Sequence, residues 1–372
     1  MAGPLAGHRV IEVAGIGPGP FCAMLLADMG ADVVRIDRQD GPAGSRQDIS
    51  GRGRRSLALD LKRPEAIEAV LRLCDGADAL IEGFRPGVME RLGLGPEVVR
   101  GRNRRLIYGR MTGWGQDGPM AKEAGHDINY ISLTGALHAM GRAGEPPAPP
   151  LNLVGDYGGG GMLLALGILA ALVERGRSGE GQVVDAAMVD GAALLMAPIY
   201  GMAARGRWSG RAGNMLDGAA PFYDSYACAC GGFVAVGPIE PAFFSEMLRR
   251  MGLSEAEFEG RMEAANWPRQ KQRLAEAFRA KTRDEWAATF AGSDACVTPV
   301  LSMAEAPAHP HLRARGTFTE QERTLQPAPA PRLSRTPSSL SRPPSLRGEH
   351  GREILEEAGF TPAEIESLLP NG

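Results

Sequence analysis

The sequence has 372 residues, of which 44% are hydrophobic, so the chain is long enough to bury one large or two moderate hydrophobic cores. Its formal net charge of -3 excludes the sustained basic excess that a partner such as nucleic acid or an anionic membrane requires. We therefore expect a soluble globular enzyme that acts on a small molecule.

The first elements are predicted to alternate as strand, turn, helix and strand, over residues 9–13, 15–20, 21–29 and 32–36. This βαβ unit is typical of nucleotide-binding folds. Its turn is close to the dinucleotide fingerprint G-x-G-x-x-G, but Pro20 stands where the last glycine belongs. Asp37 lies where NAD-binding proteins keep the acid that binds the ribose. NAD therefore stays open as a less favoured ligand.

Further strands and helices alternate after this unit, with helices over residues 64–75 and 162–175 and strands over 79–82, 105–110 and 182–186. Short apolar strands joined by right-handed crossovers form a buried parallel sheet. The apolar run at 162–173 is shorter than the roughly 20 residues that span a bilayer, so we predict a buried helix there. A helix over 189–205 follows.

The pattern changes after residue 220, where a hairpin is predicted from strands at 222–228 and 233–236. Helices follow up to about residue 291. The segment 326–347 carries six prolines, which favours an extended arm over a helix. We divide the chain into a large domain, a linker, a small domain, a proline-rich return linker and a C-terminal helical segment, over residues 1–205, 206–220, 221–300, 301–350 and 351–372.

The five cysteines are odd in number and scattered, and no secretory leader precedes them. We therefore expect reduced thiols and a cytoplasmic location. Cys228 and Cys230 lack a second pair at the spacing of a zinc site, and alternate positions of a strand account for them equally well. The sequence predicts no metal site.

Two short segments each place a proton-transfer group beside backbone that can approach a ligand closely: Gly125 to Tyr130, which contains His126, and Leu153 to Gly161, which contains Asp156. Removing a proton from carbon requires a base at contact distance, and inverting that carbon requires an acid on its opposite face. Histidine titrates near neutrality and suits the first role. A packed or capping histidine and an N-cap aspartate are the structural alternatives.

Four segments occur in the order found in the α-methylacyl-CoA racemases of the family III CoA-transferase superfamily: 110–116, 125–130, 183–191 and 237–241. The resemblance extends from the first residues to about Pro344. It implies an α/β fold with a Rossmann-like large domain on a parallel sheet, a smaller α+β domain and an interlocked homodimer. It also implies that the N-terminal and C-terminal parts of the chain together form the large domain.

The resemblance assigns the two acid/base roles to His126 and Asp156, which exchange roles between the two enantiomers. It implies that the backbone amide of Asp127 holds the thioester oxygen and that Glu240 orients the histidine. The four glycines at 158–161 are predicted to let the thioester or acyl chain approach the backbone.

The ligand implied by the resemblance is an acyl-CoA, with CoA as part of the substrate and no other cofactor. The segment from Arg35 to Arg63 carries eight Lys or Arg against four Asp, which suits a polyanion. Arg38 matches the arginine that meets the nucleotide phosphate. The complete predicted CoA-binding set is Arg38, Leu59, Asp60, Leu61, Lys62, Gly83, Phe84, Arg85, Arg91, Gly125, Asn129 and Tyr130.

The function implied is a racemase of lipid metabolism that interconverts (R)- and (S)-2-methylacyl-CoA thioesters by 1,1-proton transfer through an enolate. One alternative is a family III CoA transferase in which Asp156 attacks the thioester and forms an anhydride. Another is an acyl-CoA-binding protein without catalysis. Because the transferase reaction does not need a facing histidine, the joint presence of His126, Asp156 and Glu240 favours the racemase. The preferred acyl chain stays open.

Overall fold

The structure is a computed structural model that describes residues 3–369. The chain forms two compact units, which we name the large unit (residues up to 134, 151–195 and from 313 on) and the small unit (residues 135–150 and 196–312). The large unit thus combines N-terminal and C-terminal parts of the chain. The small unit includes more of the chain than the small domain predicted over residues 221–300.

A parallel sheet of six strands forms the centre of the large unit. Its strand order is β3-β2-β1-β4-β5-β6, so the order reverses between β1 and β4. Open sheets of this kind bind ligands beyond the carboxyl ends of the strands at such a reversal. The predicted Rossmann-like α/β fold is confirmed. The strands are β1 (Arg9–Val13), β2 (Asp32–Arg38), β3 (Arg54–Leu59), β4 (Ala79–Glu82), β5 (Ile107–Thr112) and β6 (Val183–Ala187).

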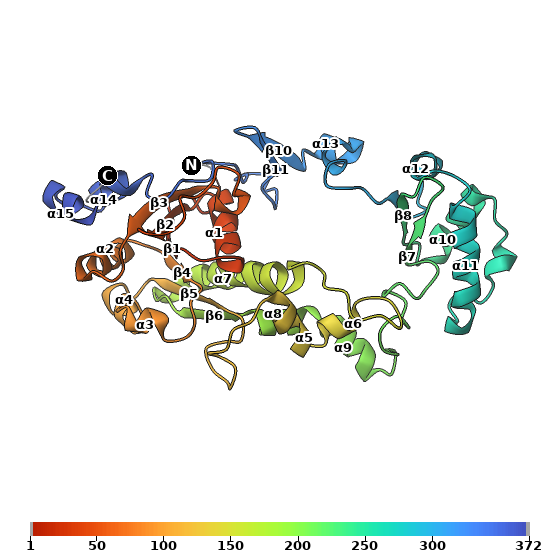
Figure 1. Cartoon of the computed structure of the whole chain (residues 1–372), viewed down its shortest axis with the longest axis horizontal. Helices are drawn as coiled ribbons and strands as arrows, with labels where there is room; N and C mark the ends of the chain where they lie inside the picture. The colour runs from red at the N-terminus through yellow and green to blue at the C-terminus, as the bar shows by residue number, and fades with distance from the viewer. Residues whose placement is uncertain (1–2, 370–372) are drawn as a thin grey trace. The chain divides into compact units, whose positions relative to one another are not determined.

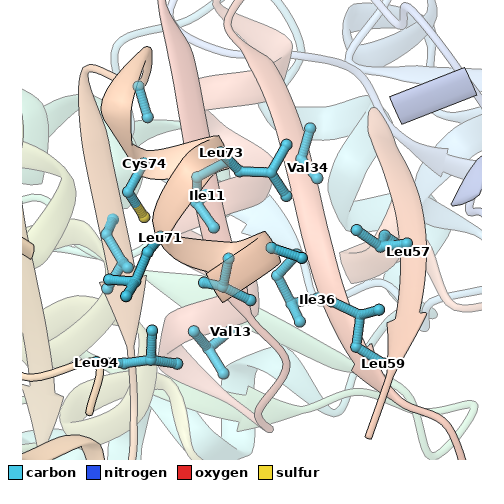
Figure 2. Close-up of a cluster of buried hydrophobic side chains, with 14 of the residues drawn as sticks. Ile11, Val13, Val34, Ile36, Leu57, Leu59, Leu71, Leu73, Cys74 and Leu94 are labelled. Carbon is cyan, nitrogen blue, oxygen red and sulfur yellow. The ribbon is translucent and has the colours of Figure 1, made fainter. Parts of the chain in front are cut away.

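Both faces of this sheet are covered, because successive side chains of a strand point to opposite faces. Ile11 belongs to the core cluster that includes Leu71 and Leu73 of α2, as Figure 2 shows, whereas Val10 belongs to the cluster on the other face. That second cluster takes apolar side chains from α1 and α7. The helices around the sheet are α1 (Pro18–Asp28), α2 (Pro64–Asp75), α3 (Val88–Arg91), α4 (Pro96–Arg102), α7 (Met162–Ser178), α14 (Gly351–Glu357) and α15 (Pro362–Leu368).

The strand β3 was not predicted, because it begins with two arginines. Both arginines are buried and each meets a carboxylate on another strand of the sheet: Arg54 lies 2.8 Å from Glu12 of β1, and Arg55 lies 2.7 Å from Asp32 of β2. Burying a charge is unfavourable unless it is paired and hydrogen-bonded. These ion pairs therefore allow two charged side chains to be buried in β3, the edge strand of the sheet.

The helix predicted from residue 162 begins earlier, because the π-helix η2 (Leu153–Gly161) runs directly into α7. The combined stretch Leu153–Ser178 has 26 residues and is long and apolar enough to cross a membrane, a test that core helices of globular proteins also pass. Its inner side chains, such as Leu164 and Ile168, are buried. Leu166 and Val173 are exposed, so the prediction of a fully buried helix is wrong for the outer face.

The glycines of η2 serve helix packing. A Cβ on Gly159 would lie 2.7 Å from the backbone nitrogen of Ala192, and a Cβ on Gly191 would lie 1.9 Å from the carbonyl oxygen of Gly159. A Cβ on Gly161 would meet Pro18 and Phe21 of α1. The expectation that these glycines open the backbone to the substrate is therefore wrong, because neighbouring chain occupies the space beside Gly159, Gly160 and Gly161.

The helix predicted over 189–205 is two helices, α8 (Met188–Leu195) in the large unit and α9 (Ala197–Ala204) in the small unit. Pro198 stands in the first turn of α9, where its missing N–H costs least. The break between the helices coincides with the boundary between the units.

The small unit is built on an antiparallel sheet of order β7-β8-β9, and the predicted hairpin is confirmed as its first two strands. Its core contains Phe222, Phe244, Trp267 and Phe278. The ring of Phe222 meets the rings of Phe244 and Trp267 edge to face, and the ring of Phe278 stacks on that of Tyr226. The elements are α6 (Ala136–Ala139), β7 (Asp224–Ala227), β8 (Phe233–Val236), α10 (Pro241–Met251), η3 (Glu255–Phe258), η4 (Ala264–Asn266), α11 (Trp267–Phe278), α12 (Arg283–Phe290), β9 (Val297–Pro299) and η5 (Ala306–Ala308).

The chain returns to the large unit through α13 (Pro310–Arg315) and the hairpin of β10 (Phe318–Gln321) and β11 (Thr324–Pro327). The proline-rich arm that follows is not helical, as predicted, and it forms backbone hydrogen bonds with the turn before β3 and the end of α1: Gly53 donates to Arg342 at 3.0 Å, and Ser339 donates to Asp28 at 3.0 Å. Figure 1 shows α14 and α15 in blue beside β3 in red, and α14 packs on this strand. Thr361 caps α15, and Glu364 accepts the N–H of Thr361 at 2.6 Å.

Candidate active site

A cavity of about 600 Å³ opens in the large unit at the carboxyl ends of β1, β4 and β5. This position matches the reversal of strand order. The cavity is lined by the turn after β1, the turn after β4 and the segment before α5 (Asp127–Leu133). Seven predicted site residues line it: Gly83, Phe84, Arg85, Gly125, His126, Tyr130 and Asp156.

His126 is the N-cap residue of α5, with an extended backbone. The side-chain oxygen of Asn129 accepts the N–H of His126 at 3.0 Å, which fixes the start of the helix. Asp127 is therefore the first residue of the helix, and its backbone N–H belongs to the four that have no partner inside the helix. The positive end of the helix dipole thus lies beside the imidazole.

Asp156 lies inside η2 and is half-buried. Its Oδ2 accepts a hydrogen bond from the Asn152 amide at 3.1 Å. Burial raises the pKa of Asp156, the Asn152 hydrogen bond opposes this rise, the charge of Asp127 adds to it and the charge of His126 opposes it. A carboxyl group whose pKa moves toward neutrality is a better proton donor and acceptor at physiological pH. The charge effect also shows that His126 and Asp156 lie within electrostatic reach of each other.

The side chain of Asp127 joins these two segments. Its Oδ2 accepts the N–H groups of Gly155 and Asp156 at 2.6 and 2.7 Å. Asp127 is buried, and a Cβ on Gly155 would lie 2.6 Å from this oxygen, so only glycine fits. The sequence predicts a role for the backbone of Asp127 but not for its side chain. The signal for this side-chain role in the sequence is the combination of an acid at the first helical position with a glycine directly before the second acid.

Tyr130 holds the segment that precedes His126. Its hydroxyl donates to the carbonyl of Gly125, and its ring packs edge to face on Trp114 at 4.8 Å. A Cβ on Gly113 would lie 2.1 Å from the same ring, so the phenol occupies a space that glycine leaves. Burial raises the pKa of Tyr130, which keeps the hydroxyl a donor. In this structure Tyr130, Gly125 and Asn129 shape the backbone around the imidazole.

Glu82, which the sequence analysis missed, lies at the floor of the cavity. One oxygen accepts the N–H of Phe84 at 2.8 Å, and the other accepts from Arg110 at 3.0 Å. Burial raises the pKa of Glu82 to about 7, against the lowering effects of the Phe84 and Arg110 contacts. These bonds fix the turn that carries Gly83 to Arg85. The only signal in the sequence is an acid at the end of an apolar strand.

The other predicted CoA-binding residues follow the carboxyl ends of neighbouring strands, outside the lining of this cavity. Arg38 ends β2 and pairs with Asp40 through contacts of 2.9 and 3.0 Å, and both side chains are exposed. Leu59 ends β3 and is buried in the core. Asp60, Leu61 and Lys62 follow it, and Lys62 donates its N–H to Asp60. Arg91 is an exposed residue of α3.

Glu240 lies in the small unit, whereas His126 and Asp156 lie in the large unit. It is exposed and stands at the N-cap position of α10, but its side chain makes no capping hydrogen bond. Over residues 3–369, no group of three or more His, Cys, Asp or Glu side chains is arranged to hold a metal ion.

Comparison with known proteins identifies the family of this chain. The model of CoA-transferase family III matches residues 5–351. The chain belongs to this family. It is 50% identical to the α-methylacyl-CoA racemases of mouse and human, over 98% of this chain and 96% of each relative. The crystal structure of a CAIB/BAIF family protein from Brucella suis covers 96% of this chain and 100% of its own, with a TM-score of 0.82 and 27% identity.

The contacts of Asp127 predict that its mutation changes both the stability of the protein and the pKa of Asp156. Asp127→Ala leaves two amides of η2 without their acceptor, so the free energy of unfolding should fall by roughly 2–5 kcal/mol in chemical denaturation. Asp127→Asn removes the negative charge that raises the pKa of Asp156, and the ionised form of Asp156 is then favoured. Its pKa, measured by NMR titration, should therefore fall toward the ordinary value.

Asp190→Asn on α8 is the matched control, because Asp190 is exposed in the same unit. It should change the free energy of unfolding by no more than about 0.5 kcal/mol. If Asp127→Ala behaves like this control, the two hydrogen bonds do not join α5 to η2.

Proposed function

We propose that this protein is an α-methylacyl-CoA racemase, which interconverts (R)- and (S)-2-methylacyl-CoA thioesters. The observation that carries the proposal is the presence of His126 and Asp156 in one cavity, in a chain that is 50% identical to curated racemases over nearly its whole length. We further propose a cytoplasmic enzyme of lipid metabolism that uses no cofactor other than the CoA of its substrate.

In the proposed reaction, one of the two groups removes the α-proton of the thioester and the other protonates the opposite face of the enolate. The negative charge that develops on the thioester oxygen is stabilised by the backbone N–H of Asp127, at the positive end of α5. Protons enter and leave only through His126 and Asp156, and the roles reverse for the other enantiomer. The raised pKa of Asp156 supports its use as an acid as well as a base.

The CoA moiety is proposed to extend from this cavity along the carboxyl ends of β4, β1, β2 and β3. Arg85 and Arg91 would then meet the diphosphate, residues 59–62 the adenosine and Arg38 the nucleotide phosphate. These basic side chains are exposed at the same edge of the sheet, and arginine binds phosphate oxygens in a bidentate manner. Arg38 would exchange its pairing with Asp40 for the phosphate.

We propose that the active unit is an interlocked homodimer in which Glu240 of one protomer orients His126 of the other. Support comes from large apolar side chains that are exposed on α5, α7 and α8 of the large unit: Leu133, Met162, Leu166, Val173, Leu194 and Leu195. Exposed apolar groups in such number are typical of a protein interface. A carboxylate that holds the tautomer of an imidazole is a common arrangement.

The first test follows the α-proton. In deuterated water, either enantiomer of a 2-methylacyl-CoA should gain deuterium at Cα and lose its chirality without an added acceptor acid. His126→Ala and Asp156→Ala should each reduce this epimerisation by about 10² or more, while CoA-ester binding persists. NMR of the product and calorimetric binding make the two measurements.

Strict dependence on an added carboxylate acceptor would identify a CoA transferase instead. Tight acyl-CoA binding by the unmodified protein without any deuterium uptake would identify a binding protein. Near-normal turnover in either alanine variant would remove that residue from the mechanism.

The second test separates the nucleotide from the thioester. Arg38→Ala should raise the KM for a full CoA ester by about tenfold or more, because a hydrogen bond to a charged phosphate is lost. A truncated pantetheine thioester lacks that phosphate, so its KM should be nearly unchanged. Steady-state kinetics with both substrates provide the measurement. Equal losses for the two substrates would place Arg38 away from the nucleotide.

The third test asks whether two protomers share a site. His126→Ala and Glu240→Ala chains, each with low activity alone, should recover activity when co-expressed, because a heterodimer then contains one intact site. Tandem-affinity purification isolates the heterodimer, and sedimentation verifies its mass. Inactive verified heterodimers, or a monomeric native protein, would contradict the shared site.

A further inference from the structure

Arg261 lies in the small unit, in the segment between η3 and α11, and its guanidinium is enclosed by aromatic rings. Its Cζ lies 5.0 Å from the ring centroid of Phe222 and 4.9 Å from that of Phe244. A guanidinium at this distance from two rings is held by cation–π attraction as well as by packing. One of its nitrogens, Nη2, donates to the carbonyl of Ile239 at 2.9 Å. Ile239 directly precedes Glu240.

The backbone that carries Arg261 is itself fixed by α11. The indole N–H of Trp267 donates to the carbonyl of Arg261 at 2.7 Å, and the amide of Gln270 donates to the carbonyl of Glu259 at 3.0 Å. Both donors are buried. These hydrogen bonds therefore fix the backbone of Arg261, and with it the position of the guanidinium beside the bend between β8 and α10.

The charges around Arg261 point to Glu240 as its partner. Burial lowers the pKa of Arg261, and the charge of Glu240 opposes this effect. The second terminal nitrogen, Nη1, is buried and has no hydrogen-bond partner within residues 3–369. Glu240 uses none of its carboxylate oxygens to cap α10. A buried cationic donor without an acceptor is unfavourable, and the Glu240 carboxylate is the acidic group whose charge acts on this guanidinium.

We infer that Arg261 is a positioning residue that holds the backbone before Glu240 and directs the Glu240 carboxylate. This inference rests on the proposed role of Glu240 toward His126. Arg261 touches no substrate in this account and acts only through Glu240. Its effect should therefore appear in turnover and not in substrate affinity, and it should vanish when Glu240 no longer carries a carboxylate.

A double-mutant cycle tests this inference on the full-length protein. Arg261→Met keeps an apolar side chain between the two rings but removes the donors, and it should lower kcat for epimerisation by about tenfold, with KM changed less than about twofold. Added to Glu240→Gln, the same substitution should cause no further loss. Arg261→Lys keeps the cation above the rings but cannot donate to two acceptors in a planar fork, so its kcat should fall by a smaller factor.

Arg249→Met is the matched control. Arg249 lies on α10 of the same unit, is largely exposed and pairs with Glu246. It should leave kcat and KM unchanged. Thermal unfolding of each variant verifies that it is folded. If Arg261→Met does not fold, Arg261→Lys replaces it in the double-mutant cycle.

The outcomes separate the inference from the role on which it rests. If Glu240→Gln alone keeps full turnover, the role of Glu240 is wrong and the inference falls with it. If Glu240→Gln lowers kcat but the Arg261 substitutions lower it by the same factor in both backgrounds, only the inference is overturned. A rise in KM without a change in kcat would likewise overturn it. Loss of the Arg261 effect in the Glu240→Gln background supports it.

Discussion

The active site of this protein depends on one carboxylate that accepts two backbone amides. Asp127 Oδ2 binds the N–H groups of Gly155 and Asp156, and it thereby joins the start of α5 to the π-helix η2. His126 directly precedes Asp127, and Asp156 supplies one of the amides. The two proposed acid/base groups, His126 and Asp156, are therefore positioned by hydrogen bonds that neither of their own side chains makes. The charge of Asp127 also helps to raise the pKa of Asp156.

The fold brings these segments together at the reversal of strand order between β1 and β4. The loops after the two strands diverge there, which leaves a crevice that no crossover covers. Side chains that hold the backbone of the neighbouring segments shape this crevice. Tyr130 holds Gly125 before the imidazole, and Glu82 holds the turn after β4 through Phe84. Arg261 extends the same principle to the small unit, where it fixes the bend before Glu240.

Long-range ion pairs and close helix contacts explain the main errors of the sequence analysis. The pairs of Arg54 with Glu12 and of Arg55 with Asp32 join residues far apart in the chain, so β3 has no local pattern that predicts a strand. The glycines of η2 are typical of a loop when read locally. In the structure Gly159 and Gly191 allow two helices to touch along their backbones. The reason for these glycines therefore lies in a contact that only the folded chain contains.

The sequence by itself determined the features that depend on near neighbours. Apolar strands alternating with helices predicted the parallel sheet, and two strand segments separated by a short turn predicted the hairpin of β7 and β8. Matched segments around His126 and Asp156 predicted the chemistry. Only the tertiary structure decided the strand order, the boundaries of the two units, and the partners of Asp127, Glu82 and Arg261. Those contacts join residues distant in sequence, and local periodicity carries no information about them.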